Sequence, residues 1–503
     1  MGMSANRLAV VSGADSDLYC LNSSGIQKVD AAGGVTQLIA SDDCSLSGPG
    51  ANVRDVFLLP DGSFVVSLNE GFSVRLLKYS WDERAELDKN KTINIWSLED
   101  NDSVRAAINV FRTKHPDAVI NYEIALGADG AASTEDAIRN LNTRLLNGDG
   151  PDIMILDDCP VETYINEGIL LDLTGKLEVG GIYPQILKII DSAGLYVVAA
   201  QFSIPTLIGL SEDLMLCDSL EKIVEEAVNG QTSVPLSADG NNDPFSSLTR
   251  EDRPVFYFDS SNDVFNILWP TCAPEVISSE GLNLQALTTF VSAFKDLSDK
   301  YGLGTAESME IVRGAMSASS SGRGRAIRIG GGIISFMGER ALLGTETLMS
   351  VSFLNMFFGR GSMDGAKIVS FPGLVPATWI PSSIAGINAD SGVTDLALDF
   401  VSAMLSDTVQ GADYATGFPV TRRGVEIQID EINARISEFG DEIFEFDFDG
   451  LLEQLKTPSL MDRQVTDTVR EAAGKCCLGE KSVEEAVSEI EQVLKKYLAE
   501  RVQ

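Results

Sequence analysis

The chain has 503 residues, of which 44% are hydrophobic and 22% are charged, a composition typical of folded globular proteins. This length predicts about two to four domains. The 38 lysine and arginine residues against 74 acidic residues give a net charge of -36, which argues against nucleic acid or an anionic membrane surface as a partner.

Histidine and cysteine are too few or too scattered for most metal and hydrolase chemistry. His115 is the single histidine, so a two-histidine zinc site is impossible. It lies in a Lys-His-Pro turn, where we expect a surface position and no catalytic role. The seven cysteines include no Cys-x-x-Cys pair, which favours buried thiols over zinc or redox sites. No metal and no cofactor are therefore expected.

The chain shows no apolar stretch of about 20 residues, the length that spans a bilayer. Its opening residues also lack a basic region followed by a long apolar core, which is the pattern of a signal peptide. We expect a soluble chain whose signal or lipid anchor, if it is exported, has been removed or lies upstream of a truncated start.

The first block, residues 1–90, predicts β structure. Short apolar runs such as LAVVSG, VFLLP and SFVVSL alternate with the turn signals AGG and PDG. This pattern resembles one or two blades of a β-propeller, which closes only with about four blades or more. The block therefore either packs on its neighbour or belongs to a longer propeller, and we favour the second. The charged residues 81–91 are predicted as a linker.

From residue 92 the pattern changes to alternating strands and helices. Strands are predicted at 92–96, within NYEIAL and at 152–156, with a helix before each of the last two. Ser133 and Asp136 resemble a capping box at the start of the second helix. This alternation predicts a mainly parallel sheet, with ligands expected at the carboxyl ends of its strands.

The final third of the chain also predicts helices. Thr394 can cap one, and Ser482 with Glu485 forms a capping box for the last. Residues 321–332 are rich in glycine but lack the Lys-Ser/Thr ending of a phosphate-binding loop, so we expect a mobile loop. Asp447, Asp449 and Gly450 lack the downstream glutamate of a calcium loop, so a turn is expected there.

Four separated segments resemble the extracellular solute-binding proteins of bacterial ABC importers, in the carbohydrate-binding, maltose-binding-protein-like group. They agree in order over residues 91–503, and the match is weak between 205 and 370. The segments are INIWSLEDNDSVRAAINVFRTKHPDAVINYE, LNTRLLNGDGPDIMILDDCPVETYINEGILLDLT, FPGLVPATWIPSSIAGINADSGVTDLALDFVSAMLSDTVQ and GFPVTRRG.

The resemblance implies an α/β periplasmic-binding-protein type II fold with two lobes, a hinge and a ligand cleft between the lobes. It is preceded here by the small all-β segment. The implied lobe 1 comprises residues 91–205 and 383–425, and lobe 2 comprises 206–382 and 426–503. Closure of such lobes on a ligand changes the outer surface that a membrane permease contacts.

Aromatic rings and carboxylates near strand ends are the candidate ligand contacts, because sugars offer apolar ring faces and many hydroxyls. Trp96 and Asp157 follow predicted parallel strands directly and have the strongest basis. The full set is Trp96, Glu99, Asp157, Asp158, Tyr164, Trp269 and Trp379.

Each candidate also has a structural alternative. The tryptophans can pack in the core, and Tyr164 can be buried on its helix. Asp157 and Asp158 can cap the helix that begins near Val161. These alternatives stay open at the level of the sequence.

The resemblance implies a monomeric extracellular receptor that binds a sugar or oligosaccharide and delivers it to an ABC permease without chemical change. One alternative is a peptide, polyamine or metabolite as ligand, and a carboxylate-dominated cleft with few exposed aromatics would favour a cation. Another is a glycan-active enzyme with two carboxylates. A third is a structural or sensory role for the β segment.

Overall fold

A computed structural model describes most of the chain. The described residues are 9–13, 17–22, 25–40, 46, 51–70, 73–80, 88–127, 133–230, 249–278, 281–303, 331–358, 365–439 and 443–500. Within these ranges, none of the helices combines the length and hydropathy that a bilayer crossing requires.

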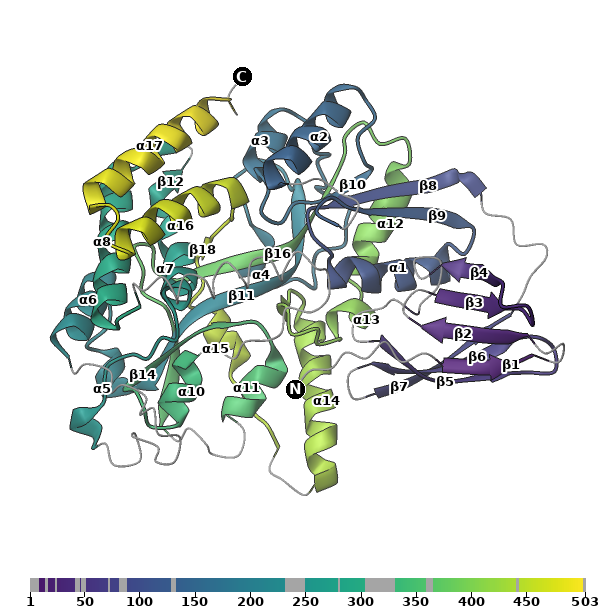
Figure 1. The fold of residues 1–503 in the computed structure, drawn as a ribbon, viewed down its shortest axis with the longest axis horizontal. Helices are drawn as coiled ribbons and strands as arrows, with labels where there is room; N and C mark the ends of the chain where they lie inside the picture. Colours follow the sequence, from purple (N-terminus) through teal and green to yellow (C-terminus); the bar gives the residue numbers. More distant parts are fainter. Residues whose placement is uncertain are drawn as a thin grey trace.

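The amino-terminal segment forms two antiparallel sheets that share a core of their own (Figure 1). Leu21 and Ile26 from the first sheet meet Val66 and Leu68 from the second, and all four are buried. The prediction of short paired strands is confirmed. The first sheet contains β1 (Ala9–Ser12), β2 (Leu18–Asn22), β3 (Gly25–Val29) and β4 (Val35–Ala40), and the second contains β5 (Ala51–Leu58), β6 (Phe64–Glu70) and β7 (Ser73–Tyr79).

A larger mixed sheet organises the rest of the molecule. Its strands lie in the order β14-β11-β16-β10-β8-β9, with β15 and β17 paired to β11 and β18 paired to β16. The pairs β8-β9 and β8-β10 are parallel, as the alternating pattern predicted. The prediction of a mainly parallel sheet is wrong for the sheet as a whole, because β16 pairs antiparallel with β10 and β11, and β14, β15 and β17 pair antiparallel with β11. The strands are β8 (Asp88–Ser97), β9 (Ala118–Ile124), β10 (Ile153–Ile155), β11 (Val197–Leu210), β14 (Leu343–Leu348), β15 (Ala366–Ser370), β16 (Thr378–Ile387), β17 (Phe418–Pro419) and β18 (Thr457–Pro458).

Helices cover both faces of the β8-β9-β10 part of the sheet, and we call this body the first lobe. Apolar residues of α1 (Asp102–Lys114) and α12 (Thr394–Met404) pack in one core, where Phe111 contacts Phe400. Residues of α2 (Thr134–Leu146) and α3 (Val161–Asn166) pack in a second core that includes Trp96. The layers therefore follow the α/β arrangement expected from the sequence.

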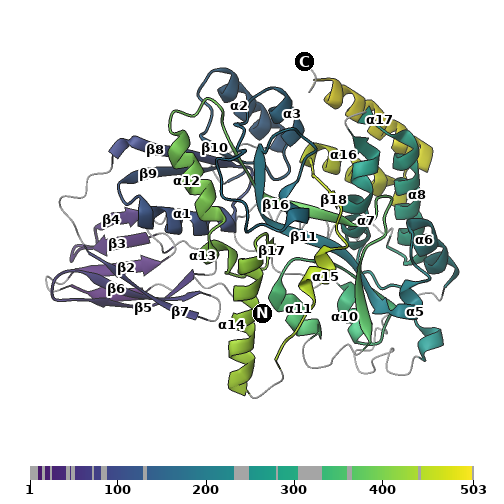
Figure 2. The same cartoon turned by 180° about the vertical axis from the view of Figure 1, so that it is seen from behind.

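The second lobe is mainly helical and lies at the other end of the long strands (Figures 1 and 2). Its core includes apolar side chains from β11, from β14 and from five helices of 10 residues or more. These helices are α6 (Leu220–Asn229), α7 (Ser261–Val276), α8 (Leu284–Lys300), α16 (Arg463–Cys477) and α17 (Val483–Glu500).

Strand β11 joins the two lobes. Residues 197–203 of this strand pair with β16, and residues 204–209 pair with β14 of the second lobe. A single strand of 14 residues thus runs through both bodies. The shorter elements are α4 (Pro184–Leu187), α5 (Ser211–Leu214), a 3-10 turn (Arg250–Asp252), β12 (Ile277–Ser278), β13 (Gly281–Leu282), α10 (Gly331–Met337), α11 (Val351–Phe358), α13 (Asp407–Gln410), α14 (Arg422–Phe439) and α15 (Phe448–Leu452).

The structure confirms two of the predicted helix caps and corrects a third. The Ser133 side chain accepts from the Asp136 N–H, and Ser482 and Glu485 exchange hydrogen bonds at the start of α17. Thr394 is not a cap, because Val393 holds that position and Thr394 already lies in the helix.

Three further predictions concern loops. Of the predicted linker 81–91, residues 88–91 belong to β8, and 81–87 lie outside the described residues. Most of the glycine-rich segment 321–332 also lies outside them. Asp447 caps α15 by accepting from the Gly450 N–H, which is a local turn contact.

Candidate functional site

Acidic side chains meet at one edge of the sheet in the first lobe. The parallel register aligns Ser97 of β8 with Ile155 of β10, so both strands end at the same edge. Glu99 follows β8 by two residues, and Asp157 and Asp158 follow β10. The structure therefore brings together the three predicted carboxylates, at the position where parallel sheets usually bind ligands.

Asp157 ties the end of β10 to β16. Its carboxylate accepts from the Ser383 and Ile384 backbone N–H groups, both at 2.9 Å, and from the Asn101 amide at 3.3 Å. The alternative that Asp157 or Asp158 caps α3 is wrong, because Pro160 is the N-cap and no side chain caps that helix. Asp157 thus positions the backbone around the site.

Two residues at this edge adopt left-handed backbone conformations. Asp158 has φ 62° and Ser383, within β16, has φ 52°. Residues other than glycine rarely adopt this backbone region, and those that do tend to occur at functional sites. Ser383 lies where the pairing between β11 and β16 skips a residue, so it marks a local irregularity in β16 beside the strand that both lobes share.

Arg463 reaches this edge from the second lobe. It is the first residue of α16, and its backbone N–H donates to the Asp158 carbonyl at 3.0 Å. Its guanidinium forms a short hydrogen-bonded ion pair with Glu99 and lies 3.9 Å from the Asp158 carboxylate. One side chain of the second lobe therefore bridges two carboxylates of the first.

Two more charged residues of α16, Asp467 and Arg470, face the same region. Arg470 donates to the Asn262 side chain and stacks over the Phe265 ring, 4.3 Å from its centroid. Its Nε is buried and has no hydrogen-bond partner among the described residues. We call Glu99, Asp158, Arg463, Asp467 and Arg470 together the Arg463 cluster.

Burial and charge act against each other in the Arg463 cluster. Burial alone would lower the pKa of Arg463, but the charges of Asp158 and Glu99 raise it above its ordinary value. Burial raises the pKa of Asp467, an effect that Arg463 and Arg470 only partly offset. Burial likewise lowers the pKa of Arg470 despite the nearby Asp467. For Asp467 and Arg470 on α16, the neighbouring opposite charges therefore do not fully offset the cost of burying the charge.

The four predicted aromatic contacts offer no exposed ring face in this structure. Trp96, Tyr164 and Trp379 lie in the same buried core, and each is at most 2% exposed. Trp269 lies apart from them in the core of the second lobe, where its Nε1 donates to Thr466. In this conformation the four rings therefore pack in the core, because apolar neighbours from several helices cover them.

Sequence reasoning did not single out Asn101, Ser383 or the α16 residues. Asn101 caps α1 and also donates to Asp157 and Ser383. Its position just before a predicted helix was a usable signal. For Arg463, Asp467 and Arg470 the sequence shows only charges on one face of a helix, and nothing local indicates what that face opposes.

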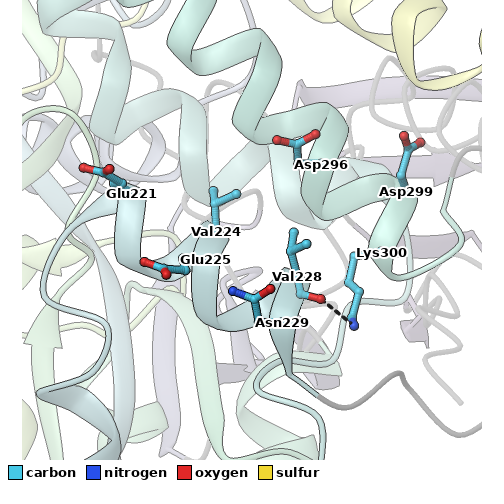
Figure 3. A pocket seen from close by; sticks show the side chains of 8 residues that line it. All are labelled: Glu221, Val224, Glu225, Val228, Asn229, Asp296, Asp299 and Lys300. Carbon is cyan, nitrogen blue, oxygen red and sulfur yellow. Dashed lines mark hydrogen bonds between the residues drawn. The ribbon is translucent and has the colours of Figure 1, made fainter.

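One surface groove lies away from this edge. A groove of about 740 Å³ runs between α6 and α8 on the second lobe (Figure 3). Its walls carry Glu221, Glu225, Asp296 and Asp299, with Val224 and Val228 between them, and none of these belongs to the Arg463 cluster. The edge described above is instead filled by direct contacts between the lobes.

No model of a known protein family and no curated protein matches this chain. Solved structures do match it, and they include extracellular solute-binding proteins. One, of family 1 from Alicyclobacillus acidocaldarius, shares 14% identity over 83% of this chain and 100% of its own, with a TM-score of 0.43.

Two others have comparable similarity. An ABC substrate-binding protein from Listeria monocytogenes, solved with cycloalternan, shares 14% identity over 81% of this chain and 99% of its own, with a TM-score of 0.45. A sugar transporter from Rhizobium etli in an open conformation shares 14% identity over 80% of this chain and 99% of its own, with a TM-score of 0.48.

Proposed function

We propose that this chain is an extracellular solute-binding protein that captures a sugar or short oligosaccharide between its lobes and delivers it to an ABC permease. The Arg463 cluster carries this proposal. It places hydrogen-bond acceptors of the first lobe opposite donors of the second, at the carboxyl ends of parallel strands. A ligand between them would contact both lobes.

The chemistry of the Arg463 cluster suits a hydroxylated ligand. Carboxylates accept from two hydroxyls at once, and guanidinium groups donate in a fixed fork. Glu99 and Asp158 supply acceptors, and Arg470 has an unused donor in Nε. The left-handed backbone of β16 at Ser383 would supply a place for the lobes to change their angle.

The proposal includes no chemical step on the ligand. A glycan-active enzyme needs a carboxylic acid free to protonate the leaving group. Here Glu99 and Asp158 both contact the one guanidinium of Arg463, so neither carboxyl is free for that role in this structure. The roles are therefore recognition and release.

The remaining parts of the proposal follow from this role. We place the chain outside the cell, attached to the membrane by a lipid anchor and acting as a monomer. Lobe 1 would comprise residues 91–205 and 383–425, and lobe 2 residues 206–382 and 426–503. Glu99, Asp157 and Asp158 stay in the proposed site, and the aromatic candidates would join it only if opening the lobes uncovers them.

A thermal-shift screen tests the proposal. The probes are neutral, acidic and amino oligosaccharides, with tripeptides and spermidine as other solute classes. A ligand at about 100 times its Kd stabilises the folded state by about 2.7 kcal/mol, which gives a clear rise in Tm. We expect at least one oligosaccharide to produce this rise.

Two variants connect the rise to the site. Glu99→Gln should abolish most of it, whereas Glu426→Gln, at an exposed ion pair of α14, should leave it unchanged. A rise with spermidine or a tripeptide and with no oligosaccharide would contradict the assignment to sugars. Turnover of a chromogenic glycoside that disappears in Glu99→Gln would contradict the binding role.

A further inference from the structure

The guanidinium of Arg463 occupies the space between the two lobes that a ligand would need. Glu99 and Asp158 hold it from the first lobe, and its side chain is 21% exposed. This group is itself a cation with several donors, supplied by the second lobe. The guanidinium therefore indicates that Glu99 and Asp158 suit a positively charged group with several hydrogen-bond donors.

A ligand that enters this space must displace Arg463 from at least one carboxylate. Glu99, Asp158 and Asp467 would then face the ligand with three negative charges. Arg470 supplies one positive charge, but it is held by Asn262 and by the Phe265 ring. The Asp467 carboxylate interacts electrostatically with Arg463 and Arg470 but forms no side-chain hydrogen bond with another described residue. The emptied site would thus have an excess of negative charge.

Neutral hydroxyls replace only part of what Arg463 provides. They can donate hydrogen bonds to Glu99 and Asp158, but they leave the partly buried charges unbalanced, which is costly. A protonated amine supplies both the donors and the charge, and charge-assisted hydrogen bonds are about twice as strong as neutral ones. The buried aromatic rings add little apolar contact that would favour a neutral sugar.

We infer that the sugar recognised here is an amino sugar, whose ammonium group replaces the Arg463 guanidinium between Glu99 and Asp158. This inference rests on the proposed function and narrows its substrate class. Arg463 would then act as an internal competitor that fills the site while no ligand is bound.

Three tetrasaccharides with one β-1,4-linked glucose skeleton test the inference by isothermal titration calorimetry. They carry hydroxyl, N-acetylamino or free amino groups at carbon 2. At about pH 5.5 the free amines are largely protonated while ordinary carboxyls remain ionised. We expect the amino form to bind about tenfold more tightly than either neutral form.

Variants of the full chain separate charge from shape. Glu99→Gln and Asp158→Asn should each weaken binding of the amino tetrasaccharide about tenfold. Arg463→Gln should strengthen it about tenfold, because the internal competitor is gone. Arg423→Gln removes the same charge from an exposed ion pair on α14 and should change nothing. The melting temperature of each ligand-free variant verifies that it is folded.

The outcomes distinguish this inference from the proposed function. Equal or tighter binding of a neutral tetrasaccharide overturns the amino-sugar inference and leaves sugar binding intact. Weaker binding by Arg463→Gln shows that Arg463 holds the ligand and does not compete with it, which also overturns the inference. Failure of all three tetrasaccharides overturns it as well, and the thermal-shift screen then decides the proposed function separately.

Discussion

Asp467 is a residue of the Arg463 cluster whose burial costs stability while its carboxyl keeps the site polar. It projects from α16 among Asp462, Glu99, Arg463 and Arg470, and burial raises its pKa in spite of the two arginines. A carboxyl whose folded-state pKa is raised favours the folded protein below its ordinary pKa of about 3.8. That contribution is lost as the pH rises through the folded-state pKa.

Removing this charge should therefore stabilise the protein at neutral pH. Asp467→Asn is expected to raise Tm by roughly 1–3 °C at pH 7, and the difference from the unmodified protein should shrink as the pH falls towards 4. Scanning calorimetry across this range measures it. A destabilised variant at pH 7 would show that the arginines, and not burial, dominate the environment of Asp467.

At the scale of elements, α16 is the helix that connects the two lobes through charge. Its interior residues Val469 and Cys476 pack in the second lobe, while its first residue contacts the first lobe through both backbone and side chain. Trp269 of α7 fixes the same helix through Thr466. Movement of the second lobe away from the first therefore requires the Arg463 contacts to break.

Salt and substitution should loosen this connection in the same direction. The screening length falls from about 10 Å at 0.1 M salt to about 3 Å at 1 M, which weakens partly exposed ion pairs. Arg463→Gln is expected to raise the radius of gyration at low salt to the value that the unmodified protein reaches only at high salt, and to cost about 1 kcal/mol of stability.

Small-angle scattering at both salt concentrations measures this change. Arg423→Gln serves as the control, because its ion pair with Glu426 lies within a single helix. Superimposable profiles for the unmodified protein and Arg463→Gln would mean that packing alone holds the lobes together.

At the scale of the whole molecule, the amino-terminal β unit has a hydrophobic core of its own, distinct from the cores of the two lobes. Among the described residues, the core of the β unit is built from side chains of residues 9–79. The lobes instead share β11, which has a long run of buried residues and pairs in both bodies. The β unit therefore adds little to the cores on which the Arg463 cluster depends.

Removal of the β unit should leave the lobes intact. A chain of residues 88–503 is expected to keep its helical circular dichroism and to bind the sugar identified by the thermal-shift screen with a Kd within about twofold of the full chain. Calorimetric titration compares the two. Loss of cooperative unfolding in the shorter chain would show that the β unit supports the lobes.

The sequence alone was sufficient for the first strands and helices of the sheet, for the final helix and for the edge of the sheet that carries carboxylates. Hydrophobic periodicity and cap residues such as Ser133 and Ser482 are local signals, and parallel strands place their carboxyl ends together whatever the rest of the chain does. Glu99, Asp157 and Asp158 could therefore be placed near one another in advance.

Only the tertiary structure decided what those carboxylates face. Arg463 lies 364 residues from Glu99 along the chain, and no local pattern relates the two. The tryptophans were ambiguous for the same reason, because a ring beside a strand end can point into a core or into a cleft. Periodicity fixes which side of an element is apolar, but only the packing of one lobe against the other determines which polar groups meet.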